Sequence, residues 1–196
     1  MITLAVILAG GEGRRMGGGK PLRRFGRTTL IGRALDLAHG YAERVAVAVR
    51  DPGQLPGCDA PLILDMPGVE GPLGGLAAAL AYGREIDAEC VLTLPCDMPD
   101  LPADLARRLA AALMAQSSAH AAMAASEGQP HPVCALWRIE ARDRLPAYLA
   151  SSRRSLRGFA EACGAVTVAW PTSARDAFAN ANTPAELAAL QPVIAA

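Results

Sequence analysis

Glycines and cationic side chains gather in the loop that follows the first apolar run of the chain, Leu4–Leu8. Glycine accepts positive φ angles and lets backbone N–H groups approach a ligand closely. Successive N–H groups in such turns form a concave anion-binding site. Arg14, Arg15 and Lys20 add positive charge to the same loop. The pattern predicts a loop that holds the phosphates of a nucleotide, built on six glycines: Gly10, Gly11, Gly13, Gly17, Gly18 and Gly19.

The loop differs from two familiar phosphate-binding patterns. A P-loop needs a serine or threonine directly after Gly-Lys, and here Pro21 follows Lys20. The dinucleotide fingerprint G-x-G-x-x-G fits Gly11 and Gly13, but Met16 occupies the place of the third glycine. Both patterns therefore fail. A plain solvated loop is disfavoured, because such linkers rarely follow a buried strand directly.

Positive charge is concentrated near this loop, although the whole chain carries 19 basic and 19 acidic residues. We interpret Arg15 and Lys20 as phosphate contacts, because they lie inside the glycine loop. Arg23, Arg24 and Arg27 follow it, and we interpret them as a solvated charged stretch. The balanced net charge argues against a nucleic-acid partner.

A second chemical centre is predicted at Asp97, directly past the apolar run 90–94. A carboxylate at the end of a buried strand is held on rigid backbone and faces the ligand crevice of a parallel sheet. The alternative is an ordinary turn-forming aspartate ahead of Pro99. Cys96 lies beside it, but no neighbouring residue would lower its pKa, so we interpret this cysteine as a packing residue.

The elements that must position these residues alternate along the chain. Alternating strands and helices with short connections predict an α/β fold with a doubly wound, mostly parallel sheet, in one domain spanning residues 1–196. The strand-like runs are 3–8, 44–49, 61–64, 90–94, 119–124, 132–137 and 165–169. The helix-like runs are 28–39, 73–83, 103–115, 140–150, 153–163 and 184–190.

Composition favours a cytoplasmic enzyme. The hydrophobic fraction is 52%, yet no apolar run approaches the roughly 18 residues needed to span a bilayer. The first residues enter a strand without the basic, apolar and cleavage segments of a signal peptide. The five cysteines contain no C-x-x-C pair, which argues against a zinc site and a disulfide framework.

The loop resembles LAGGxxxRMGxxKxL, the signature of the molybdenum cofactor guanylyltransferases within the nucleotidyltransferase superfamily. The matching residues are Leu8–Gly11, Arg15–Gly17, Lys20 and Leu22. Four further blocks follow in the family's order across nearly the whole chain: Gly71–Leu76, Leu94–Pro99, His131–Trp137 and Phe178–Pro184.

The resemblance implies a Rossmann-like nucleotidyltransferase fold and a role for each matching residue. It implies catalytic roles for Arg15, Lys20 and Asp97, with Mg²⁺ held by Asp97. It implies pterin-side contacts for Asn180 and Asn182, although Asn182-Thr183-Pro184 equally suits the cap of a last helix. Asp65 matches a nucleotide-contacting residue, or else is a turn at a strand end. The implied GTP contacts are Leu8, Ala9, Gly10, Gly11, Lys20, Asp65 and Asp97.

The chain departs from the family pattern near the second strand. Family members commonly carry an asparagine near the end of this strand, and run 44–49 contains none. Gly19 stands where an aspartate often precedes the loop lysine. Guanine is therefore recognised by backbone groups, or its selection is relaxed. His131 is either a base or a structural histidine, and the sequence leaves both open.

The function implied by the resemblance is transfer of GMP from GTP to the phosphate of molybdopterin, with release of pyrophosphate. The alternatives are a molybdopterin cytidylyltransferase, another small-molecule nucleotidyltransferase of this fold, and a nucleotide-binding adaptor that delivers cofactor. The LAGG sequence and the Pro95-Cys96 pair favour GTP over CTP. We expect a monomer that contacts cofactor-insertion proteins and molybdoenzymes transiently and binds neither nucleic acid nor membranes.

Overall fold

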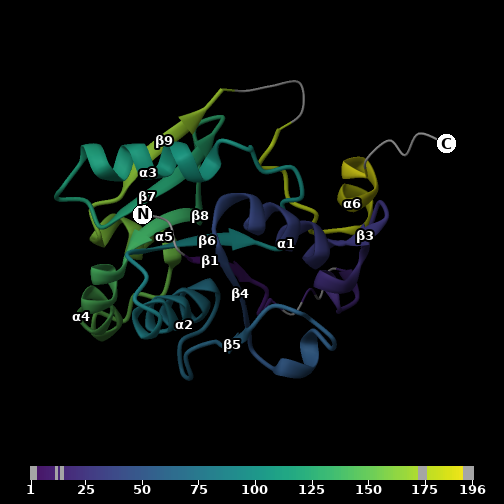
Figure 1. Ribbon diagram of the computed structural model, residues 1–196, viewed down its shortest axis with the longest axis horizontal. Helices are drawn as coiled ribbons and strands as arrows, with labels where there is room; N and C mark the ends of the chain where they lie inside the picture. The colour runs from purple at the N-terminus through teal and green to yellow at the C-terminus, as the bar shows by residue number, and fades with distance from the viewer. Residues whose placement is uncertain (1–3, 12, 14–15, 172–175, 192–196) are drawn as a thin grey trace.

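A seven-stranded sheet runs through the centre of the computed structural model, which describes residues 4–11, 13, 16–171 and 176–191 (Figure 1). The strand order across the sheet is β5-β4-β1-β6-β8-β7-β9. The strands are β1 (Leu4–Leu8), β4 (Arg44–Val49), β5 (Leu62–Leu64), β6 (Cys90–Pro95), β7 (Ala121–Ser126), β8 (Gln129–Arg138) and β9 (Val166–Trp170).

Within the described residues, every strand of this sheet except β8 points the same way. The reversal follows from the connection between β7 and β8, which is a two-residue turn. Glu127 and Gly128 both have positive φ, 50° and 73°, as the tight turn of an antiparallel hairpin requires. The predicted mostly parallel, doubly wound sheet is confirmed. The start of β8 therefore lies at the edge where the other strands end.

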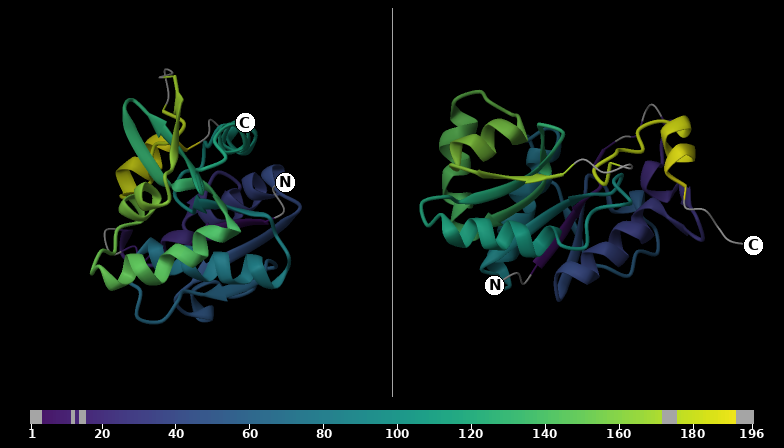
Figure 2. Two further views of the ribbon diagram at one scale, coloured as in Figure 1. Left: turned by 90° about the vertical axis from the view of Figure 1, so that its left-hand side faces the viewer. Right: turned by 90° about the horizontal axis from the view of Figure 1, so that it is seen from above.

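Helices cover both faces of the sheet. Helices α1 (Leu30–Tyr41) and α3 (Leu105–Ala115) pack on one face, and α2 (Pro72–Glu85), α4 (Leu145–Ala150) and α5 (Leu156–Ala162) pack on the other. The last helix, α6 (Pro184–Leu190), lies at the opposite end of the molecule from α4 and α5 (Figure 2). It packs through Leu187 and Leu190 against Met16, Phe25 and Leu30. This contact holds the C-terminal segment beside the glycine loop.

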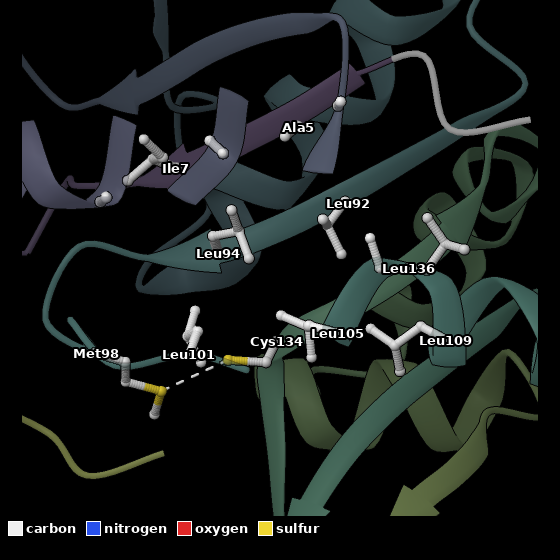
Figure 3. Close-up of a cluster of buried hydrophobic side chains, with 14 of the residues drawn as sticks. Ala5, Ile7, Leu92, Leu94, Met98, Leu101, Leu105, Leu109, Cys134 and Leu136 are labelled. Carbon is white, nitrogen blue, oxygen red and sulfur yellow. Dashed lines mark hydrogen bonds between the residues drawn. The ribbon is translucent and has the colours of Figure 1, made fainter. Parts of the chain in front are cut away.

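Strand β1 is apolar throughout because both of its faces are buried, as expected for a central parallel strand. Ala5 and Ile7 belong to the cluster under α1 and α3, while Leu4 and Val6 belong to the cluster under α2. Figure 3 shows the first cluster, in which side chains of β1, β6, α3 and β8 meet. At its edge the Cys134 Sγ lies 3.5 Å from the Met98 Sδ.

Each predicted strand and helix is present, with shifted ends. Helix α1 begins at Leu30 because the Thr29 side chain accepts a hydrogen bond from the Gly32 N–H at 3.1 Å and caps it. The stretch predicted as one helix over 140–150 is a 3-10 helix η4 (Ile139–Arg144) followed by α4. Helix α5 begins three residues later than predicted, where Ser155 caps it.

Four short elements were not predicted: the strands β2 (Arg24–Phe25) and β3 (Thr28–Thr29), and the 3-10 helices η2 (Lys20–Leu22) and η3 (Pro52–Gln54). Two or three residues are too few for a periodic apolar pattern. Among the described helices, none is both long and apolar enough to cross a membrane.

Candidate active site

Four adjacent strands end at one cavity of about 210 Å³. Gly10 follows β1, Arg50 follows β4, Asp65 follows β5 and Asp97 follows β6, and all four residues line it. A wider and more open cavity of about 950 Å³ shares Arg50, Asp65 and Lys20 with it and extends over residues 66–71. The carboxyl edge of a parallel sheet is where ligands bind in folds of this kind.

Lys20 joins two parts of the chain at this cavity. Its Nζ forms an ion pair with the Asp97 carboxylate and donates a hydrogen bond to the Asn182 Oδ1 at 2.8 Å. Only 12% of the Lys20 side chain and 17% of the Asp97 side chain are exposed. Gly19 precedes Lys20 with a φ of 59°, the left-handed conformation that glycine adopts without strain. The structure therefore brings together three predicted site residues that are far apart in the sequence.

The segment around Asn182 both caps a helix and contacts the lysine. Thr183 and Glu186 form a reciprocal capping box at the start of α6, which satisfies the backbone there. The Asn182 side chain points to Lys20 instead, and the Ala181 N–H donates to the Asp97 carbonyl at 2.9 Å. Asn180 is exposed. The pterin-side role of both asparagines stays a prediction.

The glycine loop is held partly by Arg23. Gly13, Gly17 and Gly18 all have positive φ, and the Met16 N–H donates to the Gly13 carbonyl at 2.8 Å. The Arg23 guanidinium donates to the Met16 carbonyl and, at 3.3 Å, to the Gly18 carbonyl. Arg23 is exposed, in agreement with its interpretation as part of a solvated stretch, and it also folds back to support the loop, a contact that was not predicted.

Two of the remaining loop cations are exposed, and two lie outside the described residues. Arg24 and Arg27 are exposed, in agreement with their interpretation as solvated charges. Arg14 and Arg15 lie outside the described residues, so the catalytic role expected for Arg15 stays a prediction.

The Asp65 carboxyl lies close to the backbone of two glycines, Gly10 and Gly75. A Cβ added to Gly10 would lie 2.3 Å from the Asp65 Oδ2, and one added to Gly75 would lie 3.2 Å from the Oδ1. Within the described residues the Oδ1 is buried without a hydrogen-bond partner. Burial raises the pKa of this carboxyl, and the nearby Arg50 guanidinium opposes the rise. Asp65 is also a strand-end residue, since its N–H donates to the Val49 carbonyl at 2.8 Å.

Asp65→Asn is expected to leave the fold as stable as the wild type or to stabilise it at neutral pH. Because burial raises the pKa of the folded carboxyl above its unfolded value, the charged form opposes folding at neutral pH. This penalty fades as the pH falls toward the ordinary carboxyl pKa of 3.8. Thermal melting of both proteins from neutral to acidic pH should show their Tm values converging. A lower Tm for the variant at neutral pH would show that the carboxylate is stabilised in the fold.

Two residues considered for catalysis, His131 and Cys96, are buried or packed as structural residues are. His131 stacks on Phe178 with ring centroids 4.7 Å apart, and its Nε2 lies 2.8 Å from the Ser126 Oγ. Burial lowers the pKa of His131, so the ring is neutral at physiological pH. Burial also raises the pKa of the Cys96 thiol to about 12, which keeps it protonated. These contacts agree with a structural histidine and a packing cysteine.

Three residues that line the smaller cavity had no site role in the sequence analysis: Arg50, Pro21 and Val133. Arg50 could have been found, because it is the first residue past an apolar strand and parallel strands end at one edge. Val133 lies near the carboxyl ends of the other strands only because β8 is antiparallel to its neighbours β6 and β7.

The sequence pattern of the MobA-like NTP transferase domain family matches residues 5–178. A molybdenum cofactor guanylyltransferase of Rhodopseudomonas palustris (strain BisB5) is 41% identical over 192 residues, which cover 95% of this chain and 91% of that protein. The chain belongs to the molybdenum cofactor guanylyltransferase family. The resemblance read from the five motif blocks is thereby confirmed. It is a nucleotidyltransferase family, whose members serve molybdenum cofactor biosynthesis.

A second relative agrees with this family in sequence, and a solved structure agrees in fold. The molybdenum cofactor guanylyltransferase of Rhodobacter capsulatus is 41% identical over 191 residues, covering 96% of this chain and 94% of that protein. The crystal structure of molybdopterin-guanine dinucleotide biosynthesis protein A from Archaeoglobus fulgidus superimposes with a TM-score of 0.74 at 22% identity. The superposition covers 95% of this chain and 96% of the Archaeoglobus fulgidus chain. It confirms that this guanylyltransferase family member has the nucleotidyltransferase fold.

Proposed function

We propose that this protein transfers GMP from GTP to the terminal phosphate of molybdopterin and releases pyrophosphate. The observation that carries the proposal is the meeting of Lys20, Asp97 and the glycine loop at one cavity, in a chain of this family. A phosphate oxygen of the pterin attacks the α-phosphorus of GTP. The bond between that phosphorus and the β-phosphate oxygen breaks, so the protein need supply no covalent nucleophile.

Catalysis then rests on position and charge. The loop amides and the Lys20 ammonium hold the phosphates in line with the attacking oxygen. They also face the negative charge that develops during phosphoryl transfer, which is the main means by which such enzymes lower the barrier. Lys20 suits this role because it is mostly buried at the cavity wall and already oriented by Asn182.

We also propose that Asp97 holds Mg²⁺ when the nucleotide binds. The Asp97 Oδ2 forms an ion pair with the Lys20 ammonium at the cavity. A carboxylate in this position can therefore be stabilised by a cation. Mg²⁺ is commonly held by one or two carboxylates plus substrate phosphates. When bound, the ion would neutralise charge on the phosphates.

The test is direct detection of the product. Incubation with GTP, Mg²⁺ and molybdopterin should yield a guanine dinucleotide and pyrophosphate in equal amounts. A nucleotide-binding adaptor would bind GTP and release no pyrophosphate, and that outcome would overturn the proposal. Neither the adaptor nor the cytidylyltransferase is favoured by the family. We further propose that the protein works as a cytoplasmic monomer, with transient contacts to cofactor-insertion proteins and molybdoenzymes.

Asn182→Ala should slow transfer while leaving the protein folded. The substitution removes the acceptor that orients Lys20, and loss of a hydrogen bond to a charged group costs about 1.5–3 kcal/mol, so we expect a loss of roughly tenfold or more in kcat/KM. Thr183→Ala is the matched control, since it removes the α6 cap and should cost about 1 kcal/mol of stability but little activity. Equal loss of activity in both variants would mean that Asn182 serves only to shape the start of α6.

A further inference from the structure

The C-terminal segment 176–182 is hydrogen-bonded at its start to the hairpin of β7 and β8. Ser126, the last residue of β7, donates through its Oγ to the Asp176 Oδ1 at 3.2 Å. The same Oγ lies 2.8 Å from the His131 Nε2. A hydroxyl has one proton to donate, so the histidine donates to the serine oxygen. The hydrogen bonds therefore run from His131 through Ser126 to Asp176.

Serine, histidine and aspartate are also the residues of a hydrolytic triad, but their order here is different. In a triad the histidine lies between the other two and takes the proton of the serine. Here Ser126 lies between His131 and Asp176, and its proton is directed to the carboxylate. Ser126 is also only 5% exposed. The arrangement suits the joining of two parts of the chain rather than attack on a substrate.

Asp176 and His131 both contact Phe178. The Asp176 Oδ1 accepts a second hydrogen bond, from the Phe178 N–H at 3.0 Å. The His131 ring stacks on the Phe178 ring with 5° between their planes, and Trp170 packs against Phe178 edge-on. Phe178 is buried. The start of segment 176–182 is therefore fixed to the hairpin by hydrogen bonds and by packing.

The other end of this segment orients Lys20. The Ala181 N–H donates to the Asp97 carbonyl at 2.9 Å, and the Asn182 Oδ1 accepts from the Lys20 Nζ at 2.8 Å. Asn182 lies only four positions after Phe178. A shift of Phe178 would therefore move the acceptor that holds the lysine.

We propose that His131, Ser126 and Asp176 are positioning residues for Lys20. They fasten segment 176–182 to the hairpin, so that the Asn182 amide is already in place when a nucleotide binds. A charge that is oriented before the reaction lowers the barrier more than one that must first move into place. None of the three is among the described residues that line the two cavities, so they act through Asn182. The inference rests on the proposed function for the reaction that Lys20 serves.

The test is the rate of GMP transfer by Asp176→Ala, alone and combined with Asn182→Ala. Asp176→Ala removes the acceptor of two hydrogen bonds and should lower kcat/KM about tenfold. The double variant should be no slower than Asn182→Ala alone, because coupled residues show non-additive losses. Asp176→Asn should recover most of the activity, since its amide oxygen still accepts. Ser126→Ala, which breaks one of the two bonds, should lose activity several-fold.

A second readout needs no substrate. Hydrogen exchange of the Ala181 amide, followed by NMR, should be about tenfold faster in Asp176→Ala, because the segment opens more often. Ser155→Ala is the matched control. It removes the Ser155 cap on the Gly158 N–H, a 3.0 Å hydrogen bond at the start of α5, at the other end of the molecule from α6 (Figure 2). Its Ala181 exchange and its GMP transfer should equal those of the wild type.

Three results would overturn the inference: additive losses in the double variant, an unchanged Ala181 exchange rate in Asp176→Ala, or equal loss of activity in Asp176→Ala and Ser155→Ala. The last would identify a general effect of lower stability. A wild type that transfers no GMP would count against the proposed function alone. The exchange rates would then still decide whether the network holds the segment.

Discussion

Asp97→Asn should lower the rate of GMP transfer by about a hundredfold or more, while changing the Tm far less. The substitution keeps the shape of the side chain and removes the negative charge of the carboxylate that we propose binds Mg²⁺. It also removes the ionic partner of Lys20, although the amide oxygen can still accept a hydrogen bond from the ammonium. Steady-state kinetics at saturating Mg²⁺ measure the effect, and melting curves check the fold.

The Asp97 result is informative in both directions. A large loss of kcat with a nearly unchanged Tm would support a metal-binding carboxylate. Near-normal turnover of Asp97→Asn at saturating Mg²⁺ would mean that the metal is held elsewhere. A Tm that collapses with the activity would instead identify the Lys20 ion pair as structural.

Lys20→Ala should weaken GTP binding and slow transfer, by about ten- to a hundredfold in kcat/KM. A lost charge-assisted hydrogen bond costs about 1.5–3 kcal/mol, and about 1.4 kcal/mol corresponds to a factor of ten. Arg23→Ala should have a milder, several-fold effect, because Arg23 supports the loop through the Met16 and Gly18 carbonyls rather than facing the cavity. Arg27→Ala, an exposed charge, should behave as the wild type.

The ranking of these three variants tests the loop assignment. If Lys20→Ala and Arg23→Ala have the same effect, the phosphate site is centred on another part of the loop. If Arg27→Ala matches either of them, the effect comes from the overall positive charge of the segment rather than from defined contacts.

Much of the fold could be predicted from the sequence, because apolar runs and helical spacing are local signals. The run at Leu4–Leu8 predicts a strand buried on both faces, and the structure places it at the sheet centre. The reversed direction of β8 was harder to predict. The Glu127-Gly128 turn is its only local cause, and a glutamate with positive φ is uncommon.

The candidate site could be predicted in its parts but not in its contacts. Lys20 and Asp97 each stand out by their position after a strand or in a glycine loop. The bond between Lys20 and Asn182 joins residues 162 positions apart and depends on α6 packing against Met16 and Phe25. No local pattern encodes such a contact. Arg50 was overlooked because a charged residue at a strand end is usually solvated.

Competition between nucleotides tests the central claim most directly. Transfer to molybdopterin should be measured with GTP, CTP and ATP, alone and in mixtures. Each unpaired polar group in the base site costs about 1–3 kcal/mol, so two mismatches give a preference on the order of a hundredfold. We expect kcat/KM for GTP to exceed that for CTP and ATP by at least about one to two orders of magnitude. Comparable efficiency for CTP and GTP would contradict the assignment of this protein as a guanylyltransferase.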